Sequence, residues 1–275
     1  MRPVTNCAEA EAGSVGERAT GLAKGAATTN GLVDRSFFFV SATKKKKKQK
    51  QNKCAWRLCK PTTGPWLPYL ALTMAANRRA CAVLGYEYRF EPIHGEERMD
   101  VRTRKVPLIA SVLERRDCDV LVFLDSDAWV QSPALLRRVV DRLVAEEATG
   151  CFSRDPYEER NTYVNSGSFV LRNGERARAM YRALLADLAC DARFHSSWPY
   201  DQWYTSAYVY AHRGEFVVFT PEVLNTPRGV ALRHNWYKDA AMYDDLRALE
   251  DAPPEDTDAE LPIDDAPWPN APSRA

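Results

Sequence analysis

The sequence has almost no net charge and no long apolar run. Its 38 Lys and Arg residues against 37 Asp and Glu residues give a formal charge of +1, which removes the electrostatic basis for a dedicated nucleic-acid binder. No segment approaches the ~18–20 consecutive apolar residues that a membrane-spanning helix needs. Residues 1–30 lack the apolar core of a signal peptide. We therefore expect neither a nucleic-acid partner nor a membrane span within this sequence.

The cysteines exclude two further classes of protein. There are seven of them without a Cys-x-x-Cys pair, so the sequence indicates neither a zinc ribbon nor a closed disulfide framework. With 45% hydrophobic and 27% charged residues, the composition is that of an ordinary globular protein. Collagen-like, coiled-coil and wholly disordered structures are therefore excluded.

Three segments are predicted to lie outside the folded domain or to interrupt it. Residues 1–34 are small and polar without periodicity, which predicts disorder. Residues 44–53 begin with five consecutive lysines (44–48) whose charges repel one another, which predicts a basic loop insertion, with nuclear import or binding to an anionic surface as the alternative. Residues 251–275 form an acidic, proline-rich tail that is also predicted to be disordered. A single domain is expected over residues 35–250.

Within this domain, strand-like and helix-like stretches alternate, which is typical of a layered α/β fold. Strands are predicted over residues 36–43, 86–91, 120–124, 150–153, 168–172 and 216–220, and helices over residues 67–84, 103–116, 133–147, 174–188 and 201–211. Residues 120–124 (VLVFL) are continuously apolar, which indicates a strand buried on both faces. Such strands favour a mostly parallel central sheet that is flanked by helices.

A pair of carboxylates follows this apolar run directly. In an extended chain, residues i and i+2 point to the same side, so Asp125 and Asp127 would lie together at the carboxyl edge of the sheet. Open α/β sheets bind their ligands at that edge. Two adjacent carboxylates are unfavourable without a cation, so the pair predicts a divalent metal ion that would in turn hold a diphosphate. A solvated turn is the alternative, because a lone Asp-x-Asp is common by chance.

Three short signals follow in order. Residues 165–168 (NSGS) form a turn that can bring the backbone close to a ligand. Asp201 and Gln202 begin a predicted helix, where Asp can cap and Gln can face a ligand. An imidazole such as that of His234, beside two carboxylates, would suit a manganese-like ion. Each signal also has an ordinary structural explanation, as a turn, a helix cap and a structural histidine.

Taken in order, these motifs resemble glycosyltransferase family 34, which holds fungal α-galactosyl- and α-mannosyltransferases and plant xyloglucan α-xylosyltransferases. The resemblance extends over roughly residues 37–236 and is carried by residues 77–86 (NRRACAVLGY), Lys105, residues 124–128 (LDSDA), residues 165–173 (NSGSFVLRN), Asp201-Gln202 and His234. It implies an α/β fold of the GT-A type, which is a Rossmann-like fold of nucleotide-diphospho-sugar transferases. It also implies Mn²⁺ or Mg²⁺, a UDP-sugar or GDP-sugar donor, transfer with retention and, for a eukaryotic chain, residence in the Golgi lumen.

The resemblance also implies roles for individual residues. The implied metal ligands are Asp125, Asp127 and His234. The residues implied to lie near the donor are Ser41, Thr43, Lys105, Asp125, Ser126, Asn165, Ser166 and Gly167, with Ser41 and Thr43 against the nucleotide base. The implied catalytic residues are Gln202, below the anomeric carbon, and Asp201. The sequence departs from the family at Trp203, where the family has Asp, and at Asn235 and Trp236 after the histidine.

The predicted function is therefore metal-dependent transfer of a hexose or pentose to a hydroxyl of a glycan or glycoprotein. Five aromatic residues suit sugar rings on the acceptor side, or alternatively the core: Trp198, Tyr200, Trp203, Trp236 and Tyr237. Phosphatases of the haloacid dehalogenase type also place Asp-x-Asp after an apolar strand, although they need Thr or Val where this sequence has Trp129. A catalytically degenerate binding protein with the transferase fold is a further alternative, which Trp203 keeps open.

Overall fold

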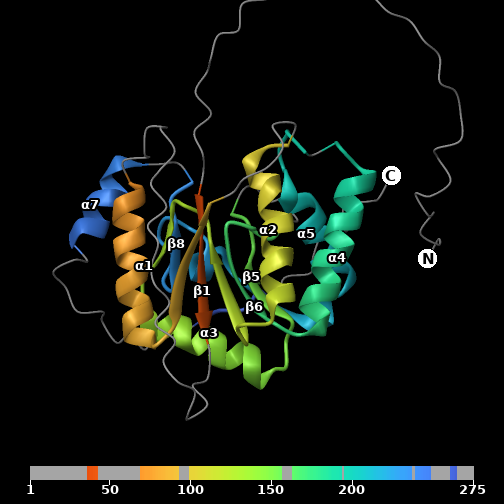
Figure 1. Cartoon of the computed structure of the whole chain (residues 1–275). Coiled ribbons are helices and arrows are strands. Elements are labelled where there is room, and N and C mark those ends of the chain that lie inside the picture. The colour runs from red at the N-terminus through yellow and green to blue at the C-terminus, as the bar shows by residue number, and fades with distance from the viewer. Residues whose placement is uncertain are drawn as a thin grey trace, which may run out of the picture. The chain divides into compact units, whose positions relative to one another are not determined.

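The computed structural model describes residues 36–42, 69–92, 99–156, 163–193, 195–236, 239–248 and 261–264 (Figure 1). The strands are β1 (Ser36–Ala42), β2 (Glu87–Pro92), β3 (Val120–Leu124), β4 (Ala128–Val130), β5 (Gly150–Ser153), β6 (Ser168–Arg172), β7 (Phe216–Phe219) and β8 (Leu232–His234). The helices are α1 (Leu70–Leu84), α2 (Val101–Arg115), α3 (Pro133–Ala145), α4 (Glu175–Cys190), α5 (Asp201–Ala211), the 3₁₀ helix η2 (Arg213–Glu215), α6 (Pro221–Leu224) and α7 (Ala240–Ala248). None of these helices is long and apolar enough to cross a membrane.

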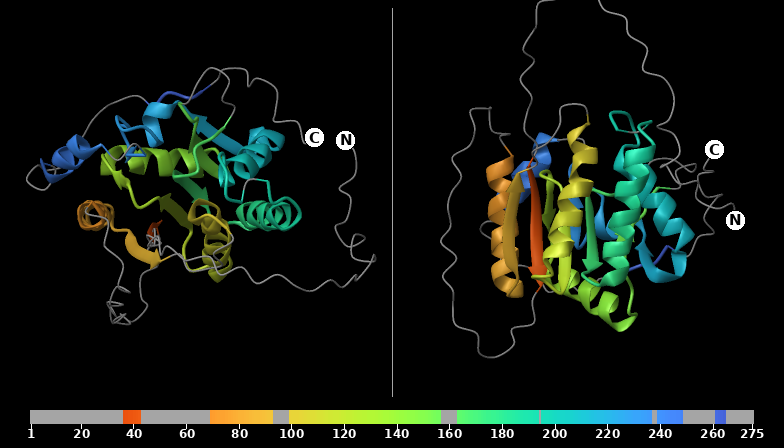
Figure 2. Two further views of the ribbon diagram at one scale, coloured as in Figure 1. Left: turned by 90° about the horizontal axis from the view of Figure 1, so that it is seen from above. Right: turned by 45° about the vertical axis from the view of Figure 1, so that its right-hand side comes forward.

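Helices cover both faces of the central sheet, whose strand order is β2-β1-β3-β6-β5-β7. Alternate side chains of a strand point to opposite faces. Val120, Val122 and Leu124 of β3 accordingly belong to an apolar cluster with residues of α1 and α3. Leu121 and Phe123 belong to a second cluster, with residues of α2, α4 and α5. Seen from above in Figure 2, α3 lies on one side of the sheet and α2 and α4 lie on the other.

Most strands of this sheet pair in an antiparallel manner. β3 is antiparallel to β1 and β6, β1 is antiparallel to β2, and β5 is antiparallel to β6, whereas β5 and β7 are parallel. The expectation of a mostly parallel sheet is therefore wrong, while the α/β class with a central sheet flanked by helices is confirmed. The apolar run of β3 reflects burial on both faces, and burial does not specify the direction of neighbouring strands.

A short C-terminal segment also belongs to the fold. Ile263 forms a β-bridge with Phe219 of β7, and the Asp264 carboxylate pairs with Arg154 at 3.1 Å. The prediction of a disordered tail is therefore wrong for residues 261–264. Leu261 and Ile263 pack against the core, a local apolar signal that the acidic and proline-rich composition of the whole tail concealed. The predictions for residues 1–34 and 44–53 concern residues outside those described.

Candidate active site

Segments distant in sequence meet at the end of β3 where the Asp-x-Asp motif begins. The short strand β4 pairs with β8, which places Ala128 opposite His234. The backbone N–H of Asn235 donates to the carbonyl oxygen of Asp127 at 2.9 Å. This pairing brings the histidine next to the two carboxylates, although it comes from a much later part of the chain.

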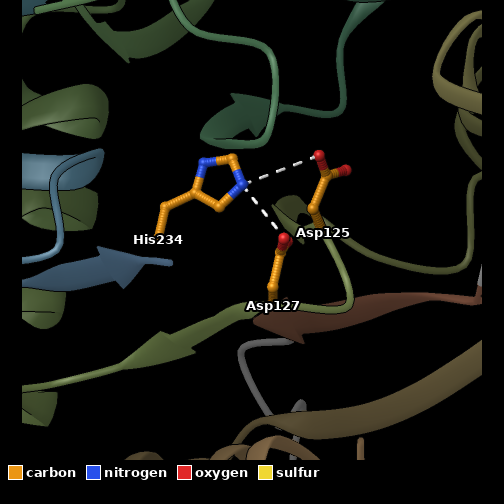
Figure 3. A group of neighbouring side chains, drawn as sticks. All are labelled: Asp125, Asp127 and His234. Carbon is orange, nitrogen blue, oxygen red and sulfur yellow. Dashed lines mark ion pairs between the residues drawn. The ribbon is translucent and has the colours of Figure 1, made fainter. Parts of the chain in front are cut away.

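Asp125, Asp127 and His234 form a compact group of potential metal ligands (Figure 3). Nε2 of His234 lies 3.2 Å from Oδ1 of Asp127 and 3.9 Å from Oδ2 of Asp125. One ligand atom from each residue lies within 4.8 Å of the others. Oδ1 of Asp125 is buried and makes no hydrogen bond among the described residues, although the Lys105 ammonium lies 3.6 Å from it. Two carboxylates and an imidazole are suitable ligands for a divalent ion such as Mn²⁺.

The imidazole of His234 is oriented by a buried neighbour. Nδ1 lies 3.1 Å from Oδ1 of Asn225, a fully buried residue. In the neutral imidazole, a proton on Nδ1 would donate to that oxygen and leave Nε2, which faces the two carboxylates, to bind a metal ion. Trp236 packs edge-to-face against the imidazole with a centroid distance of 5.4 Å. The histidine is therefore held in the orientation that metal binding requires.

The turn before β6 approaches this group so closely that it needs a glycine. The backbone N–H of Asp125 donates to the carbonyl oxygen of Gly167 at 2.7 Å. The N–H of Gly167 in turn donates to Oδ1 of Asn165 at 2.7 Å. A Cβ on Gly167 would lie 2.1 Å from Cε1 of His234 and 2.9 Å from Oδ2 of Asp125. Only a residue without a side chain fits between these two potential ligands.

Lys105 supplies a buried positive charge beside the carboxylates. Its ammonium donates to the carbonyl oxygen of Ser166 at 2.8 Å, and it lies 3.3 Å from Oδ2 of Asp201 and 3.6 Å from Oδ1 of Asp125. The side chain is only 2% exposed. The ammonium group is thus occupied by protein oxygens, and it ties α2 to the Asp-x-Asp motif and to the start of α5.

Burial and neighbouring charges shift the pKa values of this group. Burial raises the pKa of Asp125 to about 6, although Lys105 and His234 act in the opposite direction. Burial also raises the pKa of Asp201 against the opposing effect of Lys105. For His234, burial lowers the pKa, but the carboxylates of Asp127 and Asp125 outweigh burial and the pKa is raised. Such perturbed groups gathered in a cleft are typical of a functional site.

A cavity of about 510 Å³ contains this group. The residues implied by the resemblance that line it are Lys105, Asp125, Ser126, Asp127, Asn165, Ser166, Gly167, Asp201, Gln202 and His234. The structure does not bring Ser41 to the cavity. Because β1 is antiparallel to β3, Ser41 pairs with Leu121 and Phe38 pairs with Leu124, so Ser41 lies toward the opposite end of the sheet. Thr43 lies outside the described part of the chain.

Several cavity residues were not found by the sequence analysis. Asp155 follows β5 and accepts a hydrogen bond from Nε2 of Gln202 at 2.7 Å. Arg102 lies 3.6 Å from the ring centroid of Tyr200. Its spacing of three residues from Lys105 places both on one face of α2, a signal that could have identified it. No pattern in the sequence distinguishes Asp155, or Asn225 behind the histidine.

Comparison with known proteins identifies the fold. No protein-family model matches the chain, and no curated protein matches it. A solved glycosyltransferase does match. It is the crystal structure of a glycosyltransferase involved in the glycosylation of the major capsid of PBCV-1, with a TM-score of 0.52 and 19% sequence identity. The match covers 68% of this chain and 96% of that one. The chain therefore has a glycosyltransferase fold, while the resemblance to family 34 stays a prediction.

Proposed function

We propose that this protein is a metal-dependent glycosyltransferase that moves a hexose or pentose from a UDP-sugar or GDP-sugar to a hydroxyl of a glycan or glycoprotein, with retention. The observation that carries the proposal is the convergence of Asp125, Asp127 and His234 in the cavity of a chain with a glycosyltransferase fold. The order of motifs shared with family 34 further supports it, and Golgi residence belongs to the same proposal.

The three ligand residues define the part of the cavity that would receive the diphosphate. Asp125, Asp127 and His234 would hold Mn²⁺ or Mg²⁺, which as a Lewis acid would stabilise negative charge on the departing nucleotide. Asn225 keeps Nε2 of His234 directed at this position. Lys105 lies 3.6 Å from Asp125 and favours the ionised form of its carboxylate. The chain thus presents a set of ligands whose geometry is held by hydrogen bonds and an ion pair.

Gln202 and Asp201 have different roles in this proposal. The Asp201 carboxylate is 5% exposed and pairs with Lys105 at 3.3 Å, so we assign it to positioning that lysine. The Gln202 amide donates to Asp155, which leaves the carbonyl oxygen of Gln202 for the substrate. A neutral carbonyl oxygen can stabilise positive charge on the sugar without forming a covalent bond. This favours a front-face transfer, in which the acceptor attacks on the side from which the nucleotide departs.

The alternatives from the sequence differ from this proposal in testable ways. The likeness to a glycosyltransferase structure favours transfer over phosphatase chemistry. A degenerate transferase would bind the nucleotide and metal without turnover. Binding and turnover therefore have to be measured separately.

Calorimetric titration with UDP and with GDP, each with Mn²⁺ and with EDTA, tests the proposal. We expect one nucleotide to bind only with Mn²⁺, and Asp127→Asn to abolish this binding. Asp141→Asn, which alters an exposed carboxylate on α3, is the matched control and should bind as the wild type does. Absence of binding by either nucleotide would contradict the proposal, and a phosphatase assay would follow. The sugar conjugates of the nucleotide that binds are then tested as donors. An active transferase releases the nucleotide from its nucleotide-sugar, whereas a degenerate one binds the nucleotide-sugar without releasing it.

A further inference from the structure

Trp198 is an exposed aromatic side chain in the wall of the cavity. It is 55% exposed and lines the cavity. The other large apolar side chains with high exposure among the described residues, Val83 and Val144, lie on α1 and α3 and do not line it. An exposed indole lacks the stabilisation that burial provides. Because the Trp198 indole lies in the wall of a polar cavity, we infer that a bound ligand covers it.

The surroundings of Trp198 hold this wall in place. Tyr163 packs against the indole at a centroid distance of 5.3 Å and an interplanar angle of 89°. Tyr200, two residues further on, has a φ of 55°, a conformation that is uncommon for residues other than glycine. The guanidinium of Arg102, which is also paired with Asp100 at 2.8 Å, lies over the Tyr200 ring. The aromatic wall is therefore anchored to the first turn of α2.

A pair of polar side chains lies in the same cavity. Gln202 donates from Nε2 to Oδ2 of Asp155 at 2.7 Å, and both residues line the cavity. A carboxylate has about four lone-pair sites, and a primary amide offers two donors and a carbonyl acceptor. Together, the two side chains present donors and acceptors at the spacing of neighbouring hydroxyl groups. This combination of a flat apolar surface with hydrogen-bonding groups matches a sugar ring, which has apolar C–H faces and a polar edge.

We propose that Trp198, Gln202 and Asp155 form a saccharide subsite that binds the acceptor sugar, which makes the acceptor a carbohydrate. This inference rests on the proposed function. The sugar ring would lie with its C–H face on Trp198 and direct its hydroxyls to Gln202 and Asp155. A lipid or an apolar peptide does not match, because the indole is a single aromatic surface beside polar groups.

Ligand-observed saturation-transfer NMR tests the subsite without knowledge of the donor. The probes are the methyl α- and β-pyranosides of glucose, galactose, mannose and xylose, each with the Mn²⁺-nucleotide complex bound. We expect at least one probe to bind the wild type and to bind Trp198→Ala and Asp155→Asn roughly tenfold more weakly, a loss of ~1.4 kcal/mol. Val144→Ala removes part of an exposed apolar side chain outside the cavity and should bind like the wild type. Unchanged thermal unfolding of each variant would show that the fold is intact.

The outcomes separate this inference from the proposed function. If the nucleotide binds with Mn²⁺ but no probe binds, or if the probe binds Trp198→Ala as well as the wild type, the subsite is wrong and the glycosyltransferase proposal stands. If Trp198→Ala instead loses nucleotide binding, the indole holds the donor and the subsite is again wrong. If the nucleotide itself does not bind the wild type, the proposed function fails.

Discussion

Replacing Gly167 with alanine should directly disrupt the proposed metal site. The new Cβ would lie 2.1 Å from Cε1 and 2.7 Å from Nδ1 of His234, whereas ordinary carbon contacts are roughly 3.5 Å or longer. The imidazole or the turn therefore has to move by roughly 1.4 Å. Metal–ligand distances tolerate only ~0.2 Å. We expect Gly167→Ala to lower the free energy of unfolding by about 1–3 kcal/mol, as overpacking does, and to weaken Mn²⁺ binding by at least about tenfold.

The matched control is Gly214→Ala, because no atom lies within 4 Å of the corresponding Cβ position. Calorimetric Mn²⁺ titration and urea unfolding of the wild type and both variants provide the two readouts. Gly214→Ala should leave Mn²⁺ affinity unchanged. The reasoning would be refuted if Gly167→Ala bound Mn²⁺ as tightly as the wild type, since the histidine would then not be needed where the structure has it.

Two further predictions concern the charges of the site. Burial raises the pKa of Asp125 from 3.8 to about 6, so its protonated form stabilises the metal-free fold, and this stabilisation is lost as the pH rises from about 4 through 6. Although burial lowers the pKa of His234, the carboxylates raise it above 6.5, so its contribution is complete below pH 6.5 and is lost as the pH rises through the folded pKa. In thermal unfolding with EDTA, the wild type should therefore lose stability relative to Asp125→Asn from pH 4 to 8. Over the same range its Mn²⁺ affinity should rise, because the metal displaces these protons. The opposite trends would contradict the assignment of Asp125 and His234 as metal ligands. Lys105→Met should leave the carboxylates of Asp125 and Asp201 without their cation and cost roughly 3–5 kcal/mol at neutral pH, with a smaller loss near pH 5, below the pKa of Asp125 of about 6, where that carboxyl takes up a proton. Urea unfolding at both pH values measures this, and equal losses would show that the carboxylates do not depend on Lys105.

Local patterns predicted the main elements of the fold well. The ranges expected for β3, β5, β6 and α5 coincide with those observed, because apolar runs and helix start signals are encoded in neighbouring residues. β4 and β8 were not predicted, since three residues are too few to show a period. Their pairing depends on segments that are far apart in sequence. The direction of the strands was mispredicted because the apolar pattern of a strand reflects its burial, and burial does not specify whether the neighbouring strands are parallel or antiparallel.

The candidate site likewise combines residues that the sequence predicted with residues that it did not. The sequence predicted that the carboxylates of Asp125 and Asp127 lie close together, and they do. The expected extended geometry is wrong, however, because both residues lie in the turn between β3 and β4, where the N–H of Ala128 donates to the carbonyl oxygen of Asp125 at 2.9 Å. His234 was singled out because an imidazole beside two carboxylates suits a metal ion, and the family resemblance implied its role as the third ligand, whereas no local pattern placed it near Asp125 and Asp127. Asn225 and Asp155 act on His234 and Gln202 through contacts across the fold. A single polar residue without a repeat or a motif gives no sequence signal for such a contact.

The β4–β8 pairing also has a consequence for how the protein is made. Asp125 and His234 are separated by roughly a hundred residues, and closing such a loop is entropically costly. During synthesis at roughly 5–20 residues per second, the ribosome would release the Asp-x-Asp motif several seconds before the histidine that completes its ligand set. A nascent chain would thus carry two closely spaced carboxylates without their partner until β8 emerges. At the proposed metal site, the complete set of ligands would thus be available only after β8 has left the ribosome.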